Sequence, residues 1–138
     1  MITKKTFTYQ NAMLFGLITE LVLVVSQLLY MSVFVKQNPG VEFAFTTEYM
    51  KSQGFYIFQI IGFFVYTTSV YFLFKAYQIN SLGKVLVYII TGGVVELSFY
   101  LIIQATYEGA FLYSILDKFV AAVFGTIFYY YTTGKPNK

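Results

Sequence analysis

Two acidic side chains stand out among the few residues of this chain that could do chemistry. Glu20 and Glu96 each lie about half-way along an apolar stretch. A charged side chain at the bilayer midplane costs at least ~2.5 kcal/mol, so such residues usually face the interior of a helical bundle and meet a partner there. The two carboxyl groups therefore predict a polar cavity for an ion, a proton or a lipid headgroup. The alternative is that each only forms a hydrogen bond that holds two helices together.

The spacing of polar and small residues indicates which helix faces point inward. One predicted stripe consists of Gly16, Glu20 and Gln27. A second consists of Gly92, Glu96, Tyr100 and Gln104, and a third of Gln59, Gly62, Tyr66 and Ser69. Residues three or four apart share one face of a helix. We therefore predict that all three stripes face the bundle interior, where Gln27, Gln59 and Gln104 would add polar groups to the glutamates.

Asp117 and Lys118 are adjacent near the predicted outer end of the last apolar stretch. Neighbouring residues on a helix point in different directions, so the two do not pair directly. Lys118 could bind an anionic group such as a phosphate. It could equally extend its side chain to the outer surface, which is common for a lysine near the end of a membrane helix. Asp117 has no lysine within another span, so we expect water or a headgroup amine as its partner.

The composition excludes many classes of site. The chain has no Cys, and its 138 residues include no His. Disulfides, thiolate or His-ligated metal sites and a His general base are therefore excluded. No phosphate-binding loop or dinucleotide motif occurs, and nine basic residues are too few for a nucleic-acid surface. We expect no cofactor, no metal and no enzymatic activity.

The elements that would position these residues are four long apolar segments. The chain is 58% hydrophobic and 11% charged, whereas soluble domains carry roughly 25% charged residues. A transmembrane helix needs ~20 apolar residues. The predicted helices span about residues 12–35, 54–74, 84–106 and 111–131, with an outer loop at 36–53 that could hold a short amphipathic surface helix. The predicted fold is an all-α integral membrane protein, one transmembrane domain over residues 1–138 that forms a four-helix bundle.

Charge predicts the orientation of this bundle. One side would hold Lys4, Lys5, Lys75, Lys84, Lys135 and Lys138 and no acidic residue. Lysine-rich ends usually lie in the cytoplasm, so both termini are predicted there, in a bacterial cytoplasmic membrane. The matching pairs Gly16/Glu20 and Gly92/Glu96 also suggest two helical hairpins that repeat in parallel.

The pattern resembles the GtrA-like family of small four-helix membrane proteins. The second helix of that family is similar to the stretch from Gly62–Val65 to Tyr71–Phe72, and its fourth helix to Leu112–Phe128, which contains Lys118. Gly16–Thr19 is similar to the glycine region of its first helix. Phe74 and Tyr129 stand where the family usually has Asn.

The resemblance implies a protein that translocates or presents a polyprenyl-phosphate-linked sugar for cell-envelope glycosylation. Lys118 would contact the lipid phosphate, while Glu96, Glu20 and the inward glutamines would contact sugar hydroxyls. The implied partners are membrane lipid, the lipid-linked sugar and a membrane glycosyltransferase, and a homodimer is compatible with the packing faces. Two alternatives stay open. The first is an ion- or proton-coupled transporter or channel that uses Glu20 and Glu96, and the second is a non-catalytic subunit of a larger membrane complex.

Overall fold

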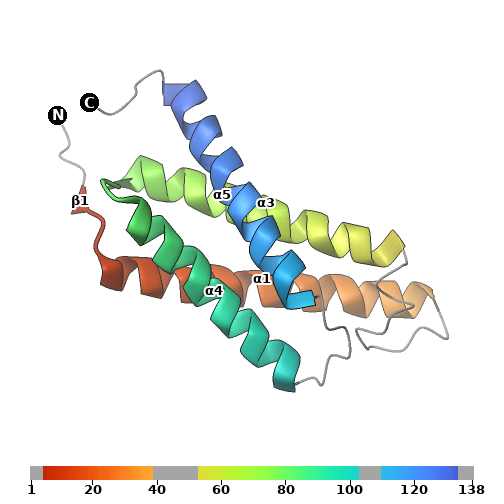
Figure 1. Ribbon diagram of the computed structural model, residues 1–138. Coiled ribbons are helices and arrows are strands. Elements are labelled where there is room, and N and C mark those ends of the chain that lie inside the picture. Colours follow the sequence, from red (N-terminus) through yellow and green to blue (C-terminus); the bar gives the residue numbers. More distant parts are fainter. Residues whose placement is uncertain (1–4, 39–52, 103–109, 134–138) are drawn as a thin grey trace.

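Four helices make up nearly all of the structure, a computed structural model that describes residues 5–38, 53–102 and 110–133 (Figure 1). The elements in chain order are β1 (Lys5–Thr6), α1 (Tyr9–Gln37), α3 (Gln53–Ala76), β2 (Tyr77–Gln78), α4 (Leu82–Ile102) and α5 (Ala110–Thr133). Each helix covers most of one predicted span. The predicted surface helix in the outer loop falls mainly on residues 39–52, outside the described residues.

Side-chain caps set the two ends of α1. Thr8 Oγ1 accepts a hydrogen bond from the Asn11 amide at 3.1 Å, and Asn11 Oδ1 accepts one from the Thr8 amide at 3.2 Å. This reciprocal capping box starts the helix three residues before the predicted Ala12. At the other end, the Asn38 side chain donates to the carbonyl of Phe34 at 2.9 Å. The 29 residues of α1 extend about 43 Å at a rise of ~1.5 Å per residue.

Among the described residues, three helices are long and apolar enough to cross a membrane. They are the segments Tyr9–Gln37 in α1, Tyr56–Ala76 in α3 and Leu82–Phe99 in α4. The expectation of an all-helical chain with membrane-spanning helices is confirmed to this extent. The result does not extend to α5, the predicted fourth span.

The helices pack in a ring, in which α1 contacts α3 and α4, and α5 contacts the same two helices. Helices α1 and α4 run in the same general direction, and α3 and α5 run the opposite way (Figure 1). The start of α1, the turn between α3 and α4 and the end of α5 therefore lie at the same end of the bundle. This arrangement brings the middle of every helix to one central region.

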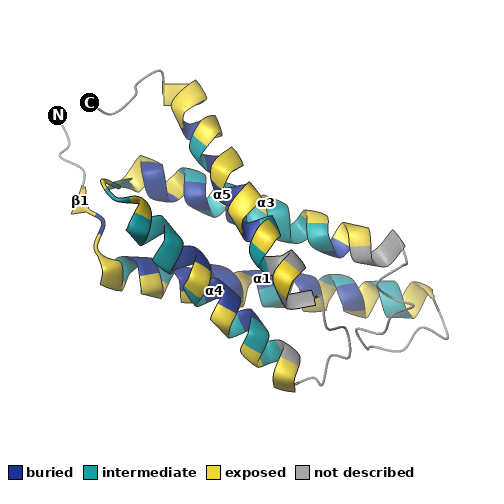
Figure 2. Cartoon of the chain, in the orientation of Figure 1, coloured by how far each residue is buried: buried dark blue, intermediate teal, exposed yellow. Residues whose placement is uncertain are grey.

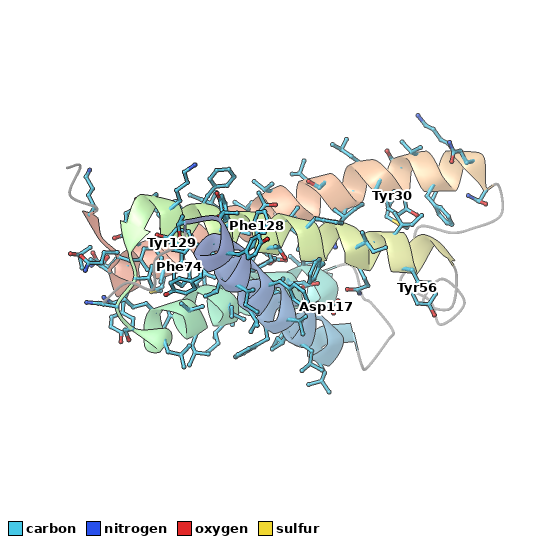
Figure 3. All side chains as sticks on the ribbon, turned by 90° about the horizontal axis from the view of Figure 1, so that it is seen from above. Tyr30, Tyr56, Phe74, Asp117, Phe128 and Tyr129 are labelled. Atoms are coloured by element: carbon cyan, nitrogen blue, oxygen red, sulfur yellow. The ribbon has the colours of Figure 1, made fainter. Side chains whose placement is uncertain are left out.

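Burial follows the environment expected in lipid. Large apolar side chains on the outer faces are exposed, including Leu29, Phe64, Val94 and Ile127, whereas the buried positions lie where the helices face one another (Figure 2). A buried aromatic cluster closes the end near the termini of the bundle. There the ring centroids of Phe74 and Tyr129 are 5.6 Å apart, and Tyr30 and Tyr56 lie toward the opposite end (Figure 3).

Two glycines allow the backbones to approach closely. A Cβ atom on Gly16 of α1 would lie 2.5 Å from the carbonyl oxygen of Tyr88 in α4. A Cβ atom on Gly125 of α5 would lie 2.6 Å from the carbonyl oxygen of Thr67 in α3. Small residues at helix contacts favour association in membranes because they permit such close packing. Each of the two closest helix pairs therefore contains one glycine that a larger residue cannot replace without a backbone shift.

A short parallel strand pair, which the sequence did not predict, ties the N-terminal segment to the middle of the chain. Lys5 and Thr6 of β1 pair with Tyr77 and Gln78 of β2, and the Phe7 amide donates to the Gln78 carbonyl at 3.2 Å. Phe7 is buried, and its ring lies 5.4 Å from that of Tyr77. We call this pairing the β-clip.

Candidate functional site

Four polar residues, one from each helix, meet at the centre of the bundle. These residues are Glu20 of α1, Tyr66 of α3, Glu96 of α4 and Lys118 of α5, which together we call the charged site. Their exposed fractions are 0% for Glu20, 1% for Tyr66, 4% for Glu96 and 3% for Lys118. Four polar side chains from four helices thus meet away from both lipid and water.

Lys118 forms the centre of the charged site. Its Nζ atom forms an ion pair and hydrogen bond with Glu96 Oε2 and lies 3.5 Å from Glu20 Oε2. It also lies 5.1 Å from the ring centroid of Tyr66, within the range of a cation–π interaction. The single ammonium group is therefore held between two carboxyl groups and the face of an aromatic ring.

Tyr66 links the charged site to α3. Its hydroxyl group donates a hydrogen bond of 2.5 Å to Glu20 Oε2. Gly92 of α4 makes room for this contact, since a Cβ atom there would overlap the Tyr66 hydroxyl and lie 3.1 Å from Glu20 Oε2. The glycine of the second predicted stripe thus accommodates the glutamate of the first stripe and its hydrogen-bond donor.

Glu20 keeps one oxygen atom without a partner. Oε2 accepts from Tyr66 and faces Lys118, but Oε1 is buried and has no hydrogen-bond partner among the described residues. Buried charges are normally paired and buried polar atoms normally hydrogen-bonded. With both carboxyl groups ionised and Lys118 protonated, the site would carry a net charge of −1. Among the described residues, the charged site therefore holds one positive charge fewer than it holds carboxylates.

A small polar cavity lies beside the ion pair of Lys118 and Glu96. Its volume is about 10 Å³, and its lining includes Gln27, Gln59 and Asp117, the last on α5 (Figure 3). A cavity of ~10–15 Å³ holds one water molecule when several polar groups surround it. Gln27, one of the lining residues, donates a hydrogen bond from its amide nitrogen to the Phe58 carbonyl at 3.4 Å. This cavity gives the half-buried Asp117 a polar environment.

A separate hydroxyl cluster lies next to the charged site. The Tyr88 hydroxyl is 3.2 Å from Thr19 Oγ1 and 3.0 Å from Ser69 Oγ, and these two atoms are 2.8 Å apart. The ring centroids of Tyr88 and Tyr66 are 5.7 Å apart. The cluster satisfies three more polar groups from α1, α3 and α4 inside the bundle.

Two apolar grooves open on the outside of the bundle. One, of about 470 Å³, lies between α4 and α5 near the β-clip end, and its lining includes Ile89, Phe119 and Thr126. The other, of about 450 Å³, lies between α1 and α3, and its lining includes Thr19 and Ser69. No residue of the charged site lines either groove in the described parts of the chain.

The structure confirms several sequence predictions about orientation and corrects one. The inward orientation predicted for Glu20, Gln27 and Glu96 is confirmed by their burial. Of the two alternatives for Lys118, extension to the outer surface is wrong, because its ammonium group lies inside the bundle between two carboxyl groups on other helices. Gln104 lies outside the described residues. The roles of these residues in binding a substrate remain predictions.

Sequence reasoning placed Tyr66 on an inward stripe and gave it no part in the site. The available signal was its position one helical turn from Gly62 on a span with no acidic residue. Its partner, Glu20, is 46 residues away in the chain, so the pairing had no local signature.

The chemistry that this arrangement supports is the binding of positive charge. In the described parts of the chain, no group of three or more acidic, His or Cys side chains is arranged to hold a metal ion. The two carboxyl groups share one lysine in a site whose residues are almost fully buried, so a proton or a single cation would change the charge balance of the site. Comparison with known proteins finds no matching protein family, no similar curated protein and no similar solved structure.

Proposed function

We propose that this chain is a small ion-coupled membrane carrier whose coupling ion binds at the charged site. The observation that supports this most directly is that Glu20 and Glu96 both face Lys118 in a buried centre, where the described residues supply two carboxyl groups for one ammonium group. Ionisable groups inside a membrane protein are expensive and usually mark an ion or proton pathway. A site whose charge is unbalanced by one can bind and release one positive charge.

The second carboxyl group also favours an ion-binding site over an ion pair that only holds the helices together. A lock between helices needs one carboxylate and one ammonium group, and Glu96 and Lys118 already form such a pair. Glu20 also accepts a hydrogen bond from Tyr66 of α3, but a neutral amide could accept that bond, so the link between the helices does not require an ionisable group there. The site is buried, and the cavity beside it has a volume of only about 10 Å³. This favours a carrier over an open channel, which would need a continuous water-filled path.

Solid-supported membrane electrophysiology tests the proposal, and it can be done before the transported substrate is known. Proteoliposomes would be exposed to rapid jumps in H⁺, Na⁺ or K⁺ concentration, and charge movement recorded as a transient current. We expect a current for one of these cations that is lost in Glu20→Gln and in Glu96→Gln. Glu42→Gln, in the segment between α1 and α3, is the matched control and should keep the current. If no cation jump gives a current above that of protein-free liposomes, the proposal is wrong.

We also propose four spans with both termini in the cytoplasm of a bacterium. The directions of the helices support this, since the start of α1 and the end of α5 lie at the same end of the bundle (Figure 1). Lys5, Lys75 and Lys84 lie at that end too, whereas Lys36 lies at the far end of α1. Such a bias in lysine is typical of the cytoplasmic side.

The second candidate is the lipid-linked sugar function that the resemblance to the GtrA-like family implies. The two outer grooves favour it, because an apolar groove of about 450 Å³ or more suits the chain of a membrane lipid. Lys118 would have to leave Glu96 and Glu20 before it contacted a phosphate. A glycosyltransferase partner or a second copy of the chain belongs to this candidate. Native mass spectrometry supports it if a polyprenyl phosphate is retained and then lost in Lys118→Ala.

A further inference from the structure

The described residues around the charged site supply one cation for two carboxyl groups, and Glu20 is the carboxyl group with an oxygen atom that has no partner among them. Glu96 has a close ion pair with Lys118, whereas Glu20 is further from that ammonium group, at 3.5 Å. Of the two Glu20 oxygens, Oε2 has a donor in Tyr66, and Oε1 has no partner among the described residues. An ionised carboxylate spreads its charge over both oxygens, so a buried Oε1 without a donor is unfavourable. A proton on Oε1 removes that charge.

The packing around Glu20 selects a proton over a metal cation. Cations such as Mg²⁺ or Ca²⁺ need six or more oxygen ligands at ~2.0–2.6 Å. Glu20 is 0% exposed, and the polar cavity beside Lys118 is not lined by Glu20 in the described structure. On the side of α4, the space next to Gly92 is already filled by the Tyr66 hydroxyl and Glu20 Oε2, so it has no room for a metal ion and its ligands. A proton needs no additional volume.

We propose that Glu20 binds one proton at Oε1 and that Glu96 is the permanent counter-ion of Lys118. This inference rests on the proposed function, because it names the coupling ion of the same site. Binding converts the Glu20 carboxylate and one H⁺ into a neutral carboxylic acid, and the charged site then changes from −1 to neutral. The titratable groups that α3, α4 and α5 place around Glu20 are Tyr66, Tyr88, Glu96 and Lys118. Asp117 lies beside Glu96 and Lys118 and lines the small cavity with them.

Infrared spectroscopy of the protein in lipid membranes tests this directly, because a protonated carboxylic acid has its own carbonyl stretching band. At neutral pH we expect one such band, shifted by exchange into D₂O. The band should disappear in Glu20→Gln. Loss in Glu96→Gln is expected as well, since Glu20 would then ionise and pair with Lys118. Neither loss alone tells which glutamate carries the proton.

Tyr66→Phe identifies the glutamate. Tyr66 donates to Glu20 Oε2, the carbonyl oxygen of the protonated acid, so removal of the hydroxyl group should shift the band to higher wavenumber. A proton on Glu96 would give a band that Tyr66→Phe does not move. Asp117→Asn is the control for the neighbouring carboxyl group and should leave the band intact. Circular dichroism verifies that each variant is folded. In the unmodified protein, the shift of the band in D₂O shows independently that the carboxyl group carries an exchangeable proton.

The outcomes separate this inference from the proposed function. A missing band, a band that Tyr66→Phe does not move, or one that Asp117→Asn removes would overturn the assignment of a proton to Glu20. If a sodium or potassium jump then still gave a current that requires both glutamates, the proposed carrier function would stand with a different ion. A band that shifts as expected, with no current for any cation, would keep the proton on Glu20 and overturn the carrier.

Discussion

Glu20 and Lys118 approach to 3.5 Å although they lie on α1 and α5, helices that pack mainly against α3 and α4 rather than against each other. Their contact crosses the middle of the bundle. Tyr66 of α3 and Glu96 of α4 touch the same two residues from the sides. The charged site therefore joins all four helices at one point.

Removal of the lysine should destabilise the protein strongly. Lys118→Met leaves two buried carboxyl groups without a cation, and breaking a buried ion pair in this way costs about 3–5 kcal/mol. The second substitution Glu96→Gln should restore most of this loss, since only one acid then remains. The free energy of unfolding can be measured by detergent denaturation followed by circular dichroism. Lys75→Met, at an exposed position near the end of α3, is the control and should change little.

A methyl group at Gly92 should disrupt the hydrogen bond between Tyr66 and Glu20. The Cβ atom of Gly92→Ala overlaps the Tyr66 hydroxyl, so the ring has to move and we expect a loss of about 1–3 kcal/mol. Tyr66→Phe removes the overlapping oxygen atom and should rescue Gly92→Ala in the double variant. Equal losses in the single and double variants, measured by the same unfolding assay, would show that the hydroxyl is not the obstacle.

Gly16 and Gly125 should tolerate alanine poorly for a different reason. At both positions the new methyl group meets a backbone carbonyl oxygen on another helix, which cannot rotate away. We expect each variant to lose about 1–3 kcal/mol of stability. Gly62→Ala is a matched control, because its nearest side-chain atom would be 3.7 Å away, an ordinary contact. Thermal melting that gives the same midpoint for all three variants would contradict the close approach of these backbones.

The absence of cysteine makes the proposed topology simple to test. The chain has no Cys, so single cysteines introduced at Lys75 and Lys36 report on one site each. A membrane-impermeant maleimide added to intact cells should label Lys36→Cys and spare Lys75→Cys, which should react only after the cells are opened. Labelling of both positions in intact cells would exclude the proposed arrangement of spans.

The sequence was a good guide to which faces point inward. Glu20 and Glu96 could be placed because a carboxyl group at the middle of an apolar helix has few favourable locations, and their stripes of small and polar residues mark one face. The helix ends were less accurate. Thr8 and Asn11 begin α1 earlier than the apolar pattern does, because a capping box uses polar residues outside that pattern.

The partners of these residues could not be predicted. Lys118 meets two acids that come from different helices, and nothing local in the sequence distinguishes a buried lysine from one that reaches the surface. The role of Gly92 depends on Tyr66, which belongs to another helix. Pairings of this kind depend on the crossing of helices, which the periodicity of a single helix does not specify.

The β-clip has a consequence for the order of assembly. β1 precedes α1, and its partner β2 follows α3, so synthesis makes the two strands before and after a complete helical hairpin. With the proposed spans, the β-clip can close only after that hairpin has crossed the bilayer twice and its end has returned to the side from which it started. Phe7, which follows β1, is then buried against Tyr77 of β2. In that topology the β-clip joins the two ends of the first hairpin only after both of its helices have inserted.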